Sequence, residues 1–132
     1  MSRDSKPYAE LLRAAIDRMP RPLRQSARRD VEELVAHAPS IRDVHALAAD
    51  KTTEPRLRAQ AIRAIGMVSK RTATPLLLSI LREDVTDAVM LWECGKALVQ
   101  TGVTGPAVTQ LLPMLRHGAL QQRKMAAWAL AL

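Results

Sequence analysis

Apolar residues recur along the chain at the three- and four-residue spacing of an amphipathic helix. Between residues 55 and 69, six of them fall on one face of a helix with about 3.6 residues per turn: Leu57, Ala61, Ile62, Ala64, Ile65 and Val68. Arg56 and Arg63 fall on the opposite side of the same segment. No segment of useful length alternates apolar and polar residues with the period of a β-strand, so the pattern predicts an all-α fold.

Proline and glycine mark where the predicted helices begin and end. Five of the eight prolines stand at the start of an apolar periodic segment, where the missing N–H would have no partner in any case: Pro7, Pro22, Pro55, Pro75 and Pro106. Gly102 and Gly118 stand where such segments stop, because glycine adopts the left-handed conformation of a helix end without strain. These marks divide the chain into eight helical segments with short connections: 7–19, 22–37, 40–50, 55–69, 74–83, 86–101, 106–117 and 120–132.

An internal repeat groups the predicted helices into pairs. The stretch 61–65 aligns with 94–98 and with 126–130, at offsets of 33 and 32 residues. The second helices of two units align at an offset of 34 residues through four positions each: Leu77, Ile80, Leu81 and Arg82, and Leu111, Met114, Leu115 and Arg116. A helix pair that recurs about every 33 residues predicts a right-handed α-solenoid, in which each pair buries its apolar face against its neighbours.

Small residues occupy the matched positions of the first helices: Ala61, Ala64, Cys94, Gly95, Ala97, Ala126 and Ala129. Side chains of this size let neighbouring helices approach closely. We therefore expect these residues to form the seam along which the helix pairs stack.

The first helix of the repeat carries an arginine followed by small residues and by an alanine next to a larger aliphatic residue. One unit has Arg58 and Ala64-Ile65, and another has Arg123 and Ala129-Leu130. This pattern resembles the short bacterial HEAT-like repeat, the type named for phycobilisome lyases. The middle unit departs from it, because Leu91 stands where its arginine should be. The resemblance implies a stack of helix pairs, and it specifies the fold far better than the function.

The repeat also predicts how the chain is organised. We expect a single HEAT-like repeat domain over 1–132. Within it, residues 1–53 form degenerate N-terminal capping helices, residues 54–84 and 85–118 form two clear repeats, and residues 119–132 supply the first helix of an incomplete repeat.

Composition narrows the fold class and the cellular setting. The chain has no Phe, one Tyr and two Trp, so its core must come from aliphatic residues and Met, which disfavours a β-sandwich or barrel. A single cysteine excludes a disulfide framework and a cysteine-based zinc site. No apolar run approaches the roughly 20 residues of a membrane span, and the first residues do not form a secretory signal. We expect a cytoplasmic bacterial protein that does not bind membranes.

Charge is concentrated toward the N-terminal end. The formal net charge is +7. Six arginines fall within seventeen residues, opposed in that window only by Asp17: Arg13, Arg18, Arg21, Arg24, Arg28 and Arg29. Arg21, Arg24 and Arg28 recur at helical spacing and, with Arg29, are candidates for contacts to the phosphates of a nucleic acid. The alternative is that the cluster is the solvated outer face of a terminal repeat.

A second pair of candidates lies on the second helices. Arg82 and Arg116 occupy the same place in successive units, the last turn of each helix. Because second helices line the concave surface of HEAT-like stacks, the resemblance implies that the two arginines could contact an acidic partner there. The alternative is that they only stabilise the helix C-termini, where cations are favourable.

The sequence contains no signature of catalysis or of a bound cofactor. No glycine-rich phosphate motif or nucleophile elbow is present, and His37, His45 and His117 are not paired at metal-ligand spacing. Cys94 lies on the apolar seam, where a buried thiol is inert. We expect Trp92 and Trp128 to be buried between repeats. We therefore predict no enzyme activity, no cofactor and no metal.

The function that the sequence favours is a non-enzymatic scaffold that holds a partner protein on the concave surface of the solenoid. A rigid curved surface loses little entropy when it binds. The first alternative is nucleic-acid binding through the N-terminal arginines. A remote alternative, implied only by the resemblance, is a bilin lyase or another phycobilisome-associated factor. The apolar character of residues 120–132 further predicts self-association through that segment.

Overall fold

A computed structural model describes residues 5–69, 71–83 and 87–131. These residues form eight α-helices and one short 3₁₀ turn: α1 (Ser5–Asp17), α2 (Arg21–His37), α3 (Ile41–Ala49), α4 (Pro55–Val68), η1 (Arg71–Ala73), α5 (Thr74–Arg82), α6 (Ala88–Thr101), α7 (Gly105–His117) and α8 (Leu120–Ala131). No strand occurs in them, so the predicted all-α class is confirmed. Every helix boundary lies within two residues of its predicted position. The predicted junction of the two clear repeats, at residues 84 and 85, lies outside the described residues, as do residues 1 and 132.

Polar side chains and prolines fix where the helices start. Glu54 accepts hydrogen bonds from the amides of Arg56 and Leu57, and Asp87 accepts one from Val89. The hydroxyl oxygen of Ser40 accepts the amide of Asp43. Each of these contacts satisfies an N–H group that has no acceptor within its own helix. The helices α3, α4 and α6 therefore begin where the sequence provides a cap, whereas α2 and α5 begin with a proline in the first turn and without a side-chain cap.

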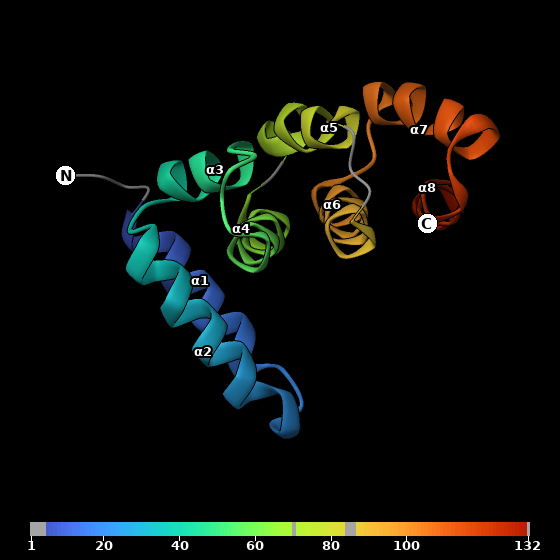
Figure 1. The fold of residues 1–132 in the computed structure, drawn as a ribbon. Coiled ribbons are helices and arrows are strands. Elements are labelled where there is room, and N and C mark those ends of the chain that lie inside the picture. The colour runs from blue at the N-terminus through green and yellow to red at the C-terminus, as the bar shows by residue number, and fades with distance from the viewer. Residues whose placement is uncertain (1–4, 70, 84–86, 132) are drawn as a thin grey trace.

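The helices from α3 onward lie in two layers (Figure 1). One layer contains α4, α6 and α8 side by side, and the other contains α3, α5 and α7. In the first layer, α4 leads into α5 and α6 leads into α7, and each pair packs against the next helix of the stack. This is the arrangement of an α-solenoid, as the internal repeat predicts.

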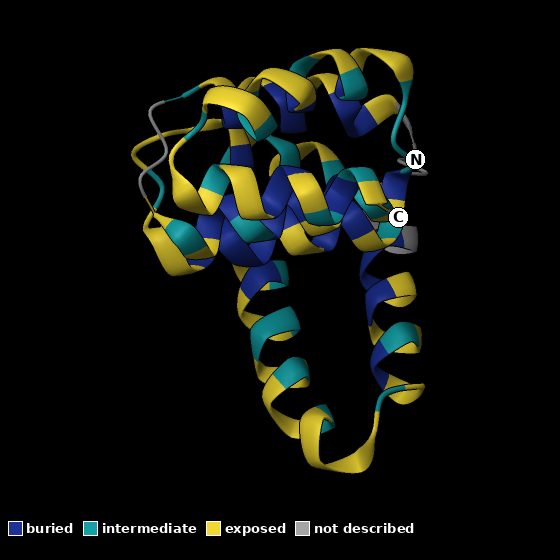
Figure 2. Ribbon diagram, turned by 90° about the vertical axis from the view of Figure 1, so that its right-hand side faces the viewer, coloured by how far each residue is buried: buried dark blue, intermediate teal, exposed yellow. Residues whose placement is uncertain are grey.

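The first two helices do not continue this stack. They form an antiparallel hairpin that projects from the α4 side, away from α5 and α7 (Figure 1). At the base of the hairpin, Tyr8 is buried and its hydroxyl donates a hydrogen bond to the carbonyl of Ala38. Arg13 pairs with Glu32 across the two helices at 2.8 Å. Burial decreases toward the tip, which is largely exposed (Figure 2).

The helices α4 and α6 of neighbouring repeats approach each other closely at Gly66. A Cβ atom built on Gly66 would lie 2.8 Å from the Cα atom of Ala97 and 2.9 Å from its Cβ atom. Such distances are shorter than any real contact of a Cβ atom, so only glycine fits at this point of α4. The small residues that the repeat alignment places at the seam are all buried. The prediction that small residues form the seam is confirmed.

A buried ion pair joins three successive helices. Arg58 of α4 donates from Nε to the carbonyl of Ala48 in α3 at 2.8 Å. Its Nη2 atom lies 3.0 Å from both carboxylate oxygens of Glu83, which follows α5. Only 8% of the Arg58 side chain and 15% of the Glu83 side chain is exposed. In the next unit Leu91 takes the place of Arg58 and is buried without a charge. This position of the repeat therefore belongs to the packed interior in both units.

The close approach at Gly66 makes a stability prediction. We expect Gly66→Ala to lower the free energy of unfolding by about 1–3 kcal/mol, because the added methyl group meets the backbone of α6. Alanine is otherwise the better helix former by about 1 kcal/mol, so the expected sign opposes helix propensity. Urea unfolding measures the change.

Gly105 provides the matched control, because nothing lies within 4 Å of a Cβ atom added there. Gly105→Ala should stay within about 0.5 kcal/mol of the wild type. A Gly66→Ala protein that unfolds at the wild-type urea concentration or above would show that α4 and α6 are not this close.

The ion pair of Arg58 makes a second prediction. Glu83→Gln should destabilise the fold by about 2–4 kcal/mol, because it leaves the buried Arg58 charge without its counter-ion. Glu32→Gln removes the same charge from an exposed pair, and its cost should be about 1 kcal/mol or less. Equal effects of the two substitutions in thermal or urea unfolding would contradict a buried Arg58.

Candidate functional site

An apolar hollow lies between the α1–α2 hairpin and α4. It has a volume of about 210 Å³. Nine apolar residues line it, from both helices of the hairpin, the loop between them and α4: Leu12, Ile16, Met19, Leu23, Ala27, Val31, Leu34, Ala64 and Met67. Three polar residues, Asp30, Gln60 and Arg63, complete the wall. We call this hollow the hairpin groove.

Large apolar side chains remain exposed around the hairpin groove. Leu23 is 53% exposed and Met67 is 39% exposed, and both line it. Met67 also lines a second hollow, together with Leu11, which is 53% exposed. Single exposed apolar residues are ordinary, but a contiguous group of them is typical of a binding surface.

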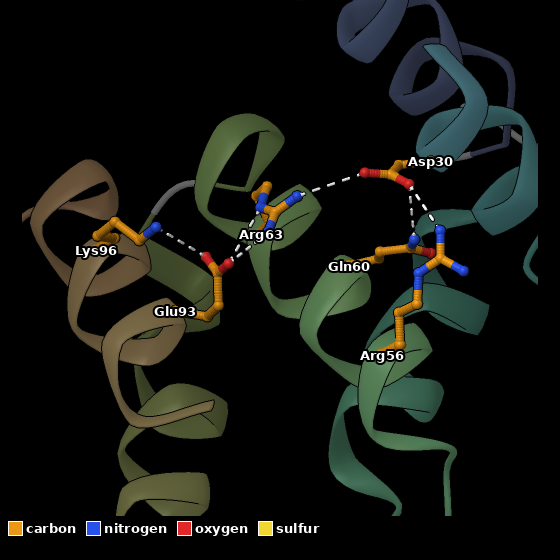
Figure 3. Close-up of polar contacts among 6 residues, drawn as sticks. All are labelled: Asp30, Arg56, Gln60, Arg63, Glu93 and Lys96. Atoms are coloured by element: carbon orange, nitrogen blue, oxygen red, sulfur yellow. Dashed lines mark hydrogen bonds and ion pairs between the residues drawn. The ribbon is translucent and has the colours of Figure 1, made fainter. Parts of the chain in front are cut away.

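A polar network holds the hairpin and α6 against α4 (Figure 3). Arg63 of α4 reaches Glu93 of α6 through Nη2 at 2.5 Å, and its Nη1 lies 3.8 Å from Asp30 of α2. Lys96 lies 3.4 Å from Glu93, and Arg56 lies 3.4 Å from Asp30. The hydrogen bonds to Glu93 raise the pKa of the Arg63 guanidinium. Of these five residues only Asp30 and Arg63 line the hairpin groove, so the network adds no net charge to its lining.

Gln60 has an unused acceptor at the wall of the hairpin groove. Its Nε2 donates to Asp30 at 3.1 Å, but its Oε1 atom is buried and receives no hydrogen bond from the described residues. Only 6% of the residue is exposed. A buried acceptor without a donor is unfavourable, so this oxygen lowers the local stability of the packing.

The structure gathers one set of the predicted arginines at the tip of the hairpin. Arg21, Arg28 and Arg29 are exposed on α2, and Arg28 pairs with Asp17 at 3.2 Å. Arg24 is partly buried, and its Nε donates to the carbonyl of Met19 at 2.8 Å. Because α2 begins at Arg21, the three arginines at helical spacing share one face, as the sequence predicts.

The other predicted pair lies elsewhere. Arg82 and Arg116 are exposed in the last turns of α5 and α7, and within the described part of the chain neither contacts a carboxylate. The hairpin projects away from the layer that contains α5 and α7 (Figure 1). The two arginine sets are therefore not brought together.

The hairpin groove lies elsewhere than the predicted partner-binding surface. The resemblance implies that second helices line the concave surface and carry Arg82 and Arg116 there, and this expectation stays a prediction. The hairpin groove is walled by α1, α2 and the first helix α4. It lies there because the hairpin stands on the α4 side and projects away from α5 and α7 (Figure 1).

The residues that make the hairpin groove were not predicted from the sequence. Asp30 looks like part of a solvated helix edge, yet it contacts Arg56, Gln60 and Arg63. A signal was present, since Leu23, Ala27, Val31 and Leu34 form an apolar stripe at helical spacing. This stripe runs to the tip of the hairpin, farther than α4 can cover.

The remaining candidates have packing roles in this structure. Trp92 and Trp128 meet edge to face between α6 and α8, with ring centroids 5.8 Å apart, and both are half-buried. Cys94 is fully buried, which raises the pKa of its thiol to about 12 and makes it unreactive as a nucleophile. On α8, Leu120 is 55% exposed, and self-association through this segment stays a prediction. Leu132 lies outside the described residues.

The described residues offer no metal site and no membrane-spanning helix. No group of three or more His, Cys, Asp or Glu residues is arranged to hold a metal ion. None of the described helices combines the length and the apolar character that crossing a membrane requires.

Comparison with known proteins adds the family. A family model described as HEAT repeats matches residues 44–131, which is 88 of the 132 residues. No curated protein and no solved structure gives a significant match. The matched region begins in α3 and ends in α8, so it covers the two-layered stack and excludes the hairpin. The match over two thirds of the chain, together with the stacked helix pairs, shows that this protein belongs to the HEAT-repeat family.

Proposed function

We propose that the protein is a non-enzymatic scaffold that holds a segment of a partner protein in the hairpin groove. HEAT repeats commonly serve protein interactions, which supports a scaffold in general. The observation that carries the choice of surface is the apolar hollow bordered by the exposed Leu23 and Met67. The hydrophobic free energy gained on binding is largest where apolar surface is exposed in the free protein and lies between two rigid walls.

The groove is held open before a partner arrives. Tyr8 ties the base of α1 to Ala38 beyond the end of α2, and Asp30 ties α2 to α4. Both walls are helices with their main-chain groups already paired. A partner therefore meets a surface that needs little ordering, which reduces the entropic cost of association.

The exposed arginines of the second helices offer another protein surface. Neither Arg82 nor Arg116 lines the hairpin groove or the hollows beside it. They therefore supply charge without a buried apolar anchor. Interfaces draw most of their affinity from a few buried residues, and isolated rim charges contribute little. We therefore place the docking site at the hairpin groove, and a role for Arg82 and Arg116 in binding stays a prediction.

Nucleic-acid binding remains the second candidate because of one observation. The tip of the hairpin carries Arg21, Arg24, Arg28 and Arg29 and projects from the rest of the molecule (Figure 1). A projecting basic element can reach the phosphates of a duplex without a clash with the stack. No observation among the described residues favours a bilin lyase over either candidate.

The scaffold proposal predicts which substitutions abolish binding of a natural partner. Protein bound from a lysate of the source organism should be lost with Ala27→Glu, because a carboxylate in the apolar hollow cannot be covered without a large cost. Affinity capture followed by quantitative mass spectrometry measures the loss.

Ser26→Glu is the matched control, because it adds the same charge at an exposed neighbouring position of α2 that does not line the groove. Arg82→Gln combined with Arg116→Gln tests the other surface. A partner retained by Ala27→Glu but lost from the Arg82 and Arg116 variant would move the docking site to α5 and α7. A partner kept equally by every variant would refute both assignments.

The nucleic-acid candidate makes its own prediction. Affinity for duplex DNA should fall steeply as salt rises, with a slope of about −0.9 in log–log form for each phosphate contacted. Replacing Arg21, Arg24, Arg28 and Arg29 with Gln should flatten that slope. Fluorescence anisotropy at several salt concentrations measures it, and an absence of binding at low salt would remove this candidate.

A further inference from the structure

We propose that the occupant of the hairpin groove is an amphipathic helix of the partner protein, with acidic residues beside its apolar face. This inference rests on the proposed scaffold function and adds the chemistry of the partner. Two observations carry it: the helical walls of the groove and the excess of positive charge at the tip of the hairpin.

The walls favour a helix over an extended segment. Each wall presents side chains at helical spacing, for example Gln60, Ala64 and Met67 on α4, which form ridges that another helix can fit between. An extended segment would bring unpaired main-chain N–H and C=O groups into an apolar hollow. No strand edge exists among the described residues to pair with them. A helix satisfies its own main-chain groups and can bury only side chains.

Positive charge at the tip of the hairpin favours an acidic helix. At the tip, five arginines stand against a single acid, Asp17: Arg18, Arg21, Arg24, Arg28 and Arg29. Of these, Arg24 lies beside the groove, because its Nε donates a hydrogen bond to the carbonyl of Met19, which lines it. The charged residues of the lining itself, Asp30 and Arg63, balance each other. Carboxylates beside the apolar face of the partner would therefore meet their cations at the tip.

Selection from a display library tests the proposal without knowledge of the natural partner. The probes are random peptides of about 18 residues, long enough to form several helical turns. They are selected on the folded full-length protein. We expect the enriched peptides to carry apolar residues at positions i, i+3 or i+4, and i+7, with Asp or Glu at the flanks. Far-ultraviolet circular dichroism should show that they gain helix when they bind.

Matched variants show where and why the enriched peptides bind. Ala27→Glu should weaken binding about tenfold or more, whereas Ser26→Glu, with the same net charge, should leave it unchanged. Arg18→Gln combined with Arg21→Gln should weaken binding about three- to tenfold and reduce its salt dependence. Arg82→Gln combined with Arg116→Gln removes the same charge from the far layer and should have no effect. Circular dichroism of each variant establishes that it is folded.

Three results would overturn the proposal of an acidic helix, and each can be distinguished from a failure of the scaffold function. The enriched peptides could fail to bind Ala27→Glu and yet be extended, neutral or basic. This result would keep the groove as a docking site but refute the acidic helix. Acidic peptides that bind Ala27→Glu and the wild type alike, and that duplex DNA displaces, would show that the tip attracts polyanions in general. A selection that enriches no peptide would also refute it. The scaffold function itself fails only if no natural partner depends on the hairpin groove.

Discussion

The stack of helix pairs depends on the close approach of α4 and α6 at Gly66. At that point the backbone of one helix lies against Ala97 of the other, with no room for a Cβ atom between them. Gly95 repeats the pattern at the next seam, where the side chain of Met125 fills the space beside it. A protein with no Phe, one Tyr and two Trp has few aromatic rings to fill wide gaps between helices. It reaches dense packing by bringing its helices together over small residues instead, and large aliphatic side chains then fill the space between the two layers.

The hairpin departs from the stack because its contacts with α4 are of another kind. Where α4 meets α6, the facing residues are small. Where α4 meets the hairpin, α1 and α2 present Leu12, Ile16, Val31 and Leu34, together with the carboxylate of Asp30. Larger side chains hold the hairpin farther from α4, and the contacts of Asp30 with Arg63 and Gln60 fix it there. An open groove follows from this change of packing, and the same change places the arginine-rich tip away from the stack. The geometry that supports partner binding thus comes from the one helix pair that lies outside the HEAT-repeat match.

Much of this architecture could be predicted from the sequence. Proline and glycine positions predicted the helix boundaries, and the alignment of Ala61, Cys94 and Ala126 predicted the seam. The angle of the hairpin could not be predicted. It depends on contacts such as Tyr8 with Ala38 and Asp30 with Arg63, between residues about thirty positions apart, and no local pattern encodes them. The groove was missed for a related reason. An apolar stripe on α2 shows that a face is buried or bound, but only the packing of α4 shows that the end of the stripe near Leu23 stays uncovered.

The central claim is that the hairpin stands off α4 and leaves an open apolar groove, and the methionines of the protein report on it directly. Met67 lies in the groove and is exposed, and Met19 lies near its outer end, whereas Met90 and Met125 are buried in the stack. Nuclear magnetic resonance of methyl-labelled methionine, with a soluble paramagnetic reagent, measures the solvent exposure of each methyl group. The account predicts strong relaxation of the Met67 and Met19 methyls and protection of Met90 and Met125. A Met67 methyl as protected as that of Met125 would mean that the hairpin closes onto α4, and would contradict the account.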